Sequence, residues 1–181
     1  MRTAGIVLLL AALPAAAQVA ARPVAAVASI DQPPLSLDVV RNLERVFDAK
    51  LDSAQPQPIN LMGATRGLYL PGYGLVFTAE LDLTLTPTAG GLLHREITPA
   101  DVAAIHQRKL AQLPVLQRLM RDMIAASARQ AGTMPDNERI VVAVRLWCQA
   151  FEDRTGLPSQ ILMTADRKSA MSGQILEVAT K

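Results

Sequence analysis

The sequence of 181 residues predicts an α+β fold, with a mostly antiparallel sheet of about four to five strands and two main helices packed on one face. Two kinds of spacing support this prediction. Residues 75–86 alternate apolar and polar side chains, which is typical of a strand with one buried face. Residues 36–51 and 98–130 instead repeat apolar side chains at helical spacing. The predicted order is helix, two strands, long helix, two strands, short helical turn and strand.

Both main helices have recognisable beginnings. Ser36 can cap the first helix, which extends over about 15 residues to Leu51. Residues 98–101 (Thr-Pro-Ala-Asp) combine an N-cap, a proline at the first helical position and an acidic residue near the positive end of the helix dipole. Pro114 lies inside the apolar stripe that continues to Gln130, so we expect a kink or two abutting helices there.

Turn sequences separate the strands. Residues 59–70 are a weaker strand candidate because two glycines interrupt them. Pro71 and Gly72 suit the two central positions of a type II turn, which leads into the strand at 75–86. Residues 139–149 are apolar on one face and mostly apolar on the other, which indicates a central strand.

The C-terminal part of the chain completes the predicted sheet. Residues 160–165 and 175–179 are the last two strand candidates. A short helical turn at 166–172 separates them.

The first 17 residues resemble a secretory signal peptide. A basic residue precedes an apolar run at 4–13, and small side chains precede a cleavage site after Ala17. Cleavage near Ala20 or Ala21 is the alternative site. A membrane anchor is the alternative, but a run of about ten residues is half of the roughly 20 that a span needs. We therefore expect an exported chain, periplasmic or extracellular, whose mature part does not span the membrane. It would have a flexible arm at 18–34 and one domain at 35–181.

Composition excludes several classes of function. The net charge is +2 and aromatic residues make up 3% of the chain, so a nucleic acid is not an expected partner. A single cysteine can form neither an internal disulfide nor a thiolate-based structural zinc site. We predict no cofactor.

The most distinctive stretch surrounds the predicted type II turn. Both tyrosines of the chain, Tyr69 and Tyr73, lie there, and Arg66 is close upstream. Two phenols and a guanidinium near an exposed turn can form a binding surface. Alternatively, the tyrosine rings pack on neighbouring strands while their hydroxyls reach water.

This stretch also carries a resemblance to a family. Residues 69–74 read Tyr-Leu-Pro-Gly-Tyr-Gly, and Val76, Phe77 and Glu80 follow. The pattern resembles one found in uncharacterised exported proteins of environmental bacteria. The resemblance implies an exported bacterial domain and no particular activity.

A second candidate site is the polar side of the strand at 75–86. Thr78, Glu80 and Asp82 are spaced to share one face, and the two carboxylates could act as an acid–base pair. With Arg66 and Tyr73 they could form the site of a small hydrolase or a ligand-binding protein. Alternatively, these side chains are the solvated face of a sheet.

Other candidates have simpler explanations. His94, Glu96 and His106 lack the spacing of a zinc motif, so we predict no metal site. Cys148 falls on the apolar side of its strand and is expected to be a buried thiol. The basic residues of the long helix are expected to form a solvated face or to meet anionic envelope components; they are Arg108, Lys109, Arg118, Arg121 and Arg129.

These observations favour a non-enzymatic exported module that binds a protein partner, its own copy or an envelope component. Its candidate binding residues are Arg66, Tyr69, Tyr73 and Glu80. No catalytic residue is predicted under this hypothesis. The alternative is the hydrolase or ligand-binding protein built on Thr78, Glu80 and Asp82.

Overall fold

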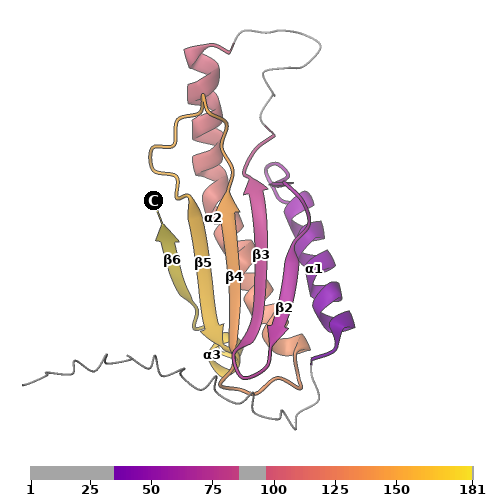
Figure 1. The fold of residues 1–181 in the computed structure, drawn as a ribbon. Coiled ribbons are helices and arrows are strands. Elements are labelled where there is room, and N and C mark those ends of the chain that lie inside the picture. Colours follow the sequence, from indigo (N-terminus) through magenta and orange to yellow (C-terminus); the bar gives the residue numbers. More distant parts are fainter. Residues whose placement is uncertain (1–34, 86–96, 181) are drawn as a thin grey trace, which may run out of the picture. The chain divides into compact units, whose positions relative to one another are not determined.

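Three helices and six strands make up an α+β fold in the residues that the computed structural model describes, 35–85 and 97–180 (Figure 1). The predicted signal peptide and arm, as well as His94 and Glu96, lie outside these residues. The elements in chain order are α1 (Leu37–Asp52), β1 (Asn60–Leu61), β2 (Arg66–Leu70), β3 (Gly74–Asp82), α2 (Pro99–Gln130), β4 (Arg139–Leu146), β5 (Gln160–Asp166), α3 (Arg167–Met171) and β6 (Leu176–Thr180).

The strands form one mixed sheet in the order β1-β3-β4-β5-β6, and β2 also pairs with β3. β1 pairs with the last residues of β3 and β2 with its first half, and both pairings are antiparallel. β5 is antiparallel to both β4 and β6. At the centre, β3 and β4 run parallel, with Gly74 opposite Arg139 and Leu81 opposite Leu146.

The central parallel pair refines the predicted fold class. The class is α+β as expected, but the sheet has six strands rather than four or five, and it is mixed. The 32-residue helix α2 lies between β3 and β4 in the chain, which allows β4 to enter the sheet in the same direction as β3. The additional strand is β1, whose two residues are too few to show a periodic pattern.

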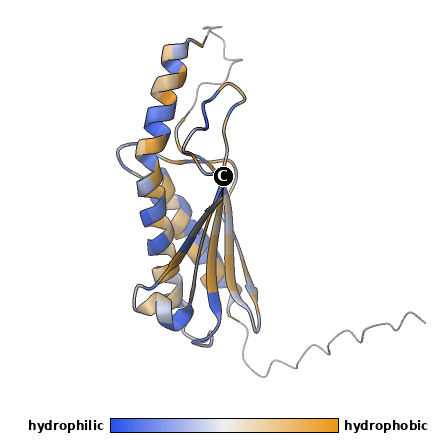
Figure 2. Ribbon diagram, turned by 90° about the vertical axis from the view of Figure 1, so that its left-hand side faces the viewer, coloured by the Kyte–Doolittle hydropathy of each residue, from blue (hydrophilic) through white to orange (hydrophobic). Residues whose placement is uncertain are grey.

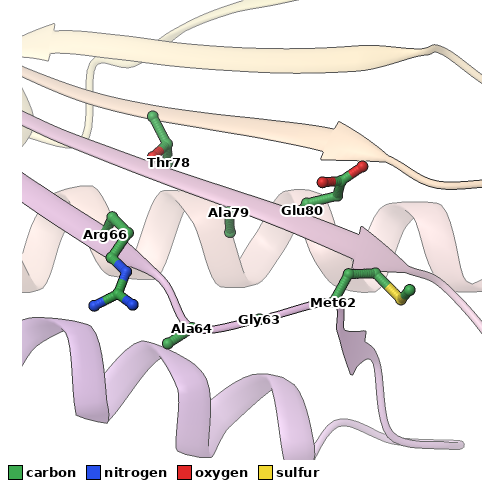
Figure 3. A pocket seen from close by; sticks show the side chains of 7 residues that line it. All are labelled: Met62, Gly63, Ala64, Arg66, Thr78, Ala79 and Glu80. Atoms are coloured by element: carbon green, nitrogen blue, oxygen red, sulfur yellow. The ribbon is translucent and has the colours of Figure 1, made fainter.

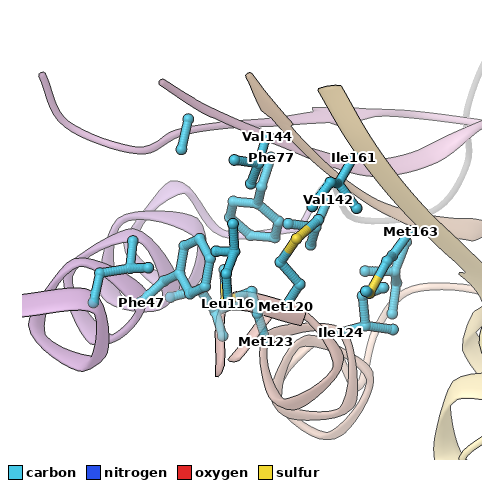
Figure 4. Close-up of a cluster of buried hydrophobic side chains, with 14 of the residues drawn as sticks. Phe47, Phe77, Leu116, Met120, Met123, Ile124, Val142, Val144, Ile161 and Met163 are labelled. Carbon is cyan, nitrogen blue, oxygen red and sulfur yellow. The ribbon is translucent and has the colours of Figure 1, made fainter. Parts of the chain in front are cut away.

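The helices lie on one side of the sheet, as Figure 2 shows for the described part of the chain. Buried side chains from α1, α2 and the sheet form the core between them (Figure 4). Phe47 of α1 and Phe77 of β3 are both fully buried. Burying a side chain of this size contributes about 1.5–3 kcal/mol, so this core holds the helices on the sheet. The labelled partners are Leu116, Met120, Met123, Ile124, Val142, Val144, Ile161 and Met163.

The predicted helix beginnings are confirmed. The Ser36 side chain accepts a hydrogen bond from the Asp38 N–H. Thr98 and Asp101 form a reciprocal capping box at the start of α2. α2 continues through Pro114, so the expectation of two abutting helices is wrong. Because Pro114 is exposed, its ring does not disturb the packed face of the helix.

The predicted type II turn is also present. The Tyr73 N–H donates to the Leu70 carbonyl at 2.9 Å, and Gly72 has a φ of 79°. No helix in the described ranges is both long and apolar enough to cross a membrane.

Candidate functional site

The sheet face opposite α1 and α2 is not covered by any described element, and we call it the uncovered face (Figures 1 and 2). Strand register places one mainly apolar row across it, which we call the apolar row: Leu68, Val76, Val141, Thr164 and Leu176. Leu68 and Leu176, at its two ends, are 59% and 63% exposed. Between them, Val76 and Thr164 are partly buried and Val141 is 6% exposed, so the apolar row reaches solvent mainly at its two ends.

Charged side chains lie on the same face, further along the strands than the apolar row. Glu80 pairs in register with Arg145, and Arg66 with Thr78. The Glu80 carboxylate is 3.9 Å from the Arg145 guanidinium, and both side chains are exposed, so the ion pair is loose.

An open pocket of about 360 Å³ lies at the break between β1 and β2 (Figure 3). Arg66, Thr78 and Glu80 line it, together with Met62 and other residues of the segment that joins the two strands. The structure thus brings three of the predicted site residues together. Tyr69, Tyr73 and Asp82 do not line this pocket.

The two predicted tyrosines have different environments. The Tyr69 hydroxyl donates to Glu138 Oε2 at 2.9 Å, and Glu138 Oε1 accepts from the Gly72 N–H at 2.8 Å. Burial and the hydrogen bond to this carboxylate raise the pKa of Tyr69 to about 12. Tyr73 is 45% exposed. Tyr69 and the buried Glu138 therefore fix the hairpin turn, and Tyr73 is the more exposed of the two tyrosines.

The expectation that Asp82 shares a face with Glu80 is wrong. Asp82 is the last residue of β3 and only 2% exposed, and its Oδ1 lies 2.7 Å from the Lys109 ammonium. The attraction of a buried ammonium overrides the alternation of faces at this strand end. Because the two carboxylates are separated, the acid–base pair of the hydrolase hypothesis does not form.

Lys109 is the centre of a buried ion cluster, formed by Lys109, Asp82 and Glu152. The expectation of a solvated Lys109 is wrong, because its side chain is 1% exposed and also contacts Glu152 Oε2. Burial lowers the pKa of Lys109, but the hydrogen bonds to the two carboxylates outweigh it and raise the pKa overall. Glu152 Oε1 has no hydrogen-bond partner among the described residues.

Helical spacing could have revealed this cluster. The buried face of α2 includes Ile105, Lys109, Gln112 and Leu116, which follow one another at helical intervals. Lys109 and Gln112 are polar, so a pattern defined by apolar residues alone does not include them. The other four basic residues predicted to be solvated are exposed: Arg108, Arg118, Arg121 and Arg129.

The ion cluster holds the chain segment that follows β4. Lys109 Nζ donates to the Trp147 carbonyl at 3.3 Å and lies 3.9 Å from the Cys148 sulfur. β4 ends at Leu146, so Cys148 is half-buried rather than fully buried on a strand. Burial raises the pKa of Cys148 although Lys109 opposes it, so the thiol stays protonated at neutral pH.

A groove of about 850 Å³ runs beside this segment. Trp147, Cys148, Arg145 and Arg154 line it, with apolar side chains from α2 and from the approach to β5. No local pattern in the sequence indicates this groove, because its lining comes from separate parts of the chain.

The described residues contain no cluster of His, Cys, Asp and Glu suited to a metal ion. His106 instead lies near Asp153, with Nδ1 3.1 Å from the Asp153 carbonyl oxygen.

Comparison with protein-family models, with curated proteins and with solved structures finds no match for this chain. The resemblance of residues 69–74 to exported bacterial proteins therefore remains an expectation.

Proposed function

We propose that this protein is an exported, non-enzymatic module that binds a protein partner through its uncovered face. The observation that carries the proposal is the apolar row. Antiparallel sheets commonly have polar side chains on a solvated face, and this row departs from that pattern. Its two ends, Leu68 and Leu176, are exposed, and large apolar side chains exposed on one face of a domain are typical of interaction sites.

The charged end of the same face fits a protein partner. Arg66, Glu80 and Arg145 border the apolar side chains without being fully paired. An apolar centre with a polar border is the usual composition of a protein interface, in which the charges contribute to orientation and specificity.

The arrangement does not favour hydrolysis. Glu80 is separated from Asp82, and the Cys148 thiol remains protonated. A general acid–base mechanism needs groups that reach the same reacting atom. Binding through the uncovered face is the better-supported function.

Replacing both exposed ends of the apolar row, Leu68→Glu with Leu176→Glu, tests the proposal. Both side chains are more than half exposed, so we expect a folded variant. Cross-linking in the native envelope fraction should trap a specific partner with the wild type and lose it with the double variant. Sedimentation velocity should show whether that partner is a second copy of the chain.

The matched control is Leu37→Glu, because Leu37 is 57% exposed at the start of α1 and away from the sheet face. This control should retain the partner. If the double variant traps the same partner as the wild type, the uncovered face is not the binding surface.

A further inference from the structure

We propose that the groove beside Trp147 binds a small amphipathic carboxylate, with the acid held by Arg154 and the apolar body held along the groove floor. The groove contains no residue of the apolar row, although Glu80 and Arg145 line it and also belong to the charged end of the uncovered face. The proposal does not depend on the function proposed above. The groove volume of about 850 Å³ is within the range of small-molecule sites.

The lining carries more positive than negative charge. Two guanidinium groups, those of Arg145 and Arg154, line the groove, against one carboxylate from Glu80. Glu80 is loosely paired with Arg145 at 3.9 Å. No carboxylate of the described residues pairs with Arg154, whose Nη2 donates to the Cys148 carbonyl at 3.4 Å. Arg154 therefore has donors left for an anion, and a guanidinium can bind a carboxylate through two of them.

The rest of the lining suits an apolar body. The apolar side chains come from α2, from the end of β4 and from the segment before β5: Leu113, Leu146, Leu157 and Pro158. The Trp147 indole adds an aromatic surface. A ligand with a short alkyl chain or ring and one carboxylate would satisfy both parts of the groove.

The buried ion cluster keeps the groove in its shape. Trp147 and Cys148 form one wall of the groove. Lys109 donates a hydrogen bond to the Trp147 carbonyl and contacts the Cys148 sulfur, and Asp82 and Glu152 pair with Lys109. The two carboxylates of the cluster do not line the groove. A preformed wall reduces the entropy that a ligand loses on binding.

The chain contains one tryptophan and one cysteine, and both line the groove, so each is a specific reporter. Titration with decanoate below its micelle concentration should change Trp147 fluorescence saturably. Decanol, which has the same chain without the charge, should bind at least about tenfold more weakly, and acetate should not bind. Decanoate should also slow the reaction of Cys148 with a maleimide.

Arg154→Gln should weaken decanoate binding about tenfold or more. The matched control is Arg118→Gln, which removes an exposed charge on α2 outside the groove and should bind as the wild type does. Circular dichroism should show that both variants are folded, and Arg145→Gln provides a second variant of the lining. The proposal is overturned if decanoate gives no saturable change, if decanol binds as tightly, or if Arg154→Gln binds as the wild type does.

Discussion

Among single residues, Gly72 and Gly74 at the β2–β3 turn are required for different physical reasons. Gly72 has a φ of 79° with open space around it, so a Cβ there meets only backbone strain. We expect Gly72→Ala to lower the free energy of unfolding by about 1 kcal/mol.

Gly74 has a φ of 130°, and a Cβ would lie 1.9 Å from the Arg139 carbonyl oxygen. Gly74→Ala should cost at least about 3 kcal/mol, because β3 and β4 would have to separate.

Urea denaturation measures both glycine effects. Gly63→Ala is the control, since Gly63 has open space and no positive φ, and it should stay within about 0.5 kcal/mol of the wild type. A Gly72→Ala variant as stable as this control would contradict the role of Gly72 in the turn.

Tyr69 and Tyr73 form a second matched pair. Tyr69→Phe removes a hydrogen bond to the buried carboxylate of Glu138 and should cost about 1.5–3 kcal/mol. Tyr73→Phe removes a hydroxyl from a side chain that is 45% exposed, so it should change stability by less than about 0.5 kcal/mol. Thermal melts of the two variants compare them directly. Equal melting temperatures would show that the Tyr69 hydroxyl does not stabilise the hairpin.

Ionisation of Tyr69 should make the protein less stable at alkaline pH. The pKa of Tyr69 rises from its ordinary value of 10.0 to about 12 on folding, because burial and Glu138 favour the neutral phenol. Its contribution to stability is therefore complete below pH 10 and is lost as the pH rises towards 12. Absorbance of the Tyr73→Phe variant at increasing pH should show Tyr69 ionising near 12, and a midpoint near 10 would contradict this.

Among the secondary-structure elements, the ion cluster connects α2 to the end of β3 and to the segment after β4 through ion pairs and a hydrogen bond. Lys109→Met leaves Asp82 and Glu152 buried without a positive charge, which should cost about 3–5 kcal/mol. Chemical denaturation of the variant measures this loss.

A triple variant separates the charge from the packing of the cluster. Lys109→Met combined with Asp82→Asn and Glu152→Met removes all three charges while keeping an acceptor for the Thr84 N–H. We expect it to recover most of the lost stability, because buried ion pairs can often be replaced by neutral groups. A triple variant as unstable as Lys109→Met alone would show that the charges are not the cause.

For the whole protein, the N-terminal residues predict export. If the N-terminal residues are a signal peptide, the exported protein should begin near Gln18. Intact-mass measurement of protein from the periplasm or the medium checks this. Protein that retains Met1, or that stays in the cytosolic fraction, would contradict export.

The elements whose causes are local could be predicted from the amino-acid sequence. Ser36 and Thr98 cap their helices through donors two or three residues away, and Pro71 and Gly72 set a turn of four residues. The alternation in β3 likewise correctly identified its buried face up to Leu81. Such features are predictable because the interacting groups are neighbours in the chain.

Contacts between residues far apart in the chain depend on the tertiary fold and could not be predicted in this way. The parallel pairing of β3 with β4 joins residues on either side of α2, and no local pattern records its direction. Glu138 reaches Tyr69 across 69 positions of the chain, and Lys109 reaches Trp147 across 38. Polar side chains enter the core at Lys109 and Asp82 because each neutralises the other there, which is a property of the pair that neither local sequence contains.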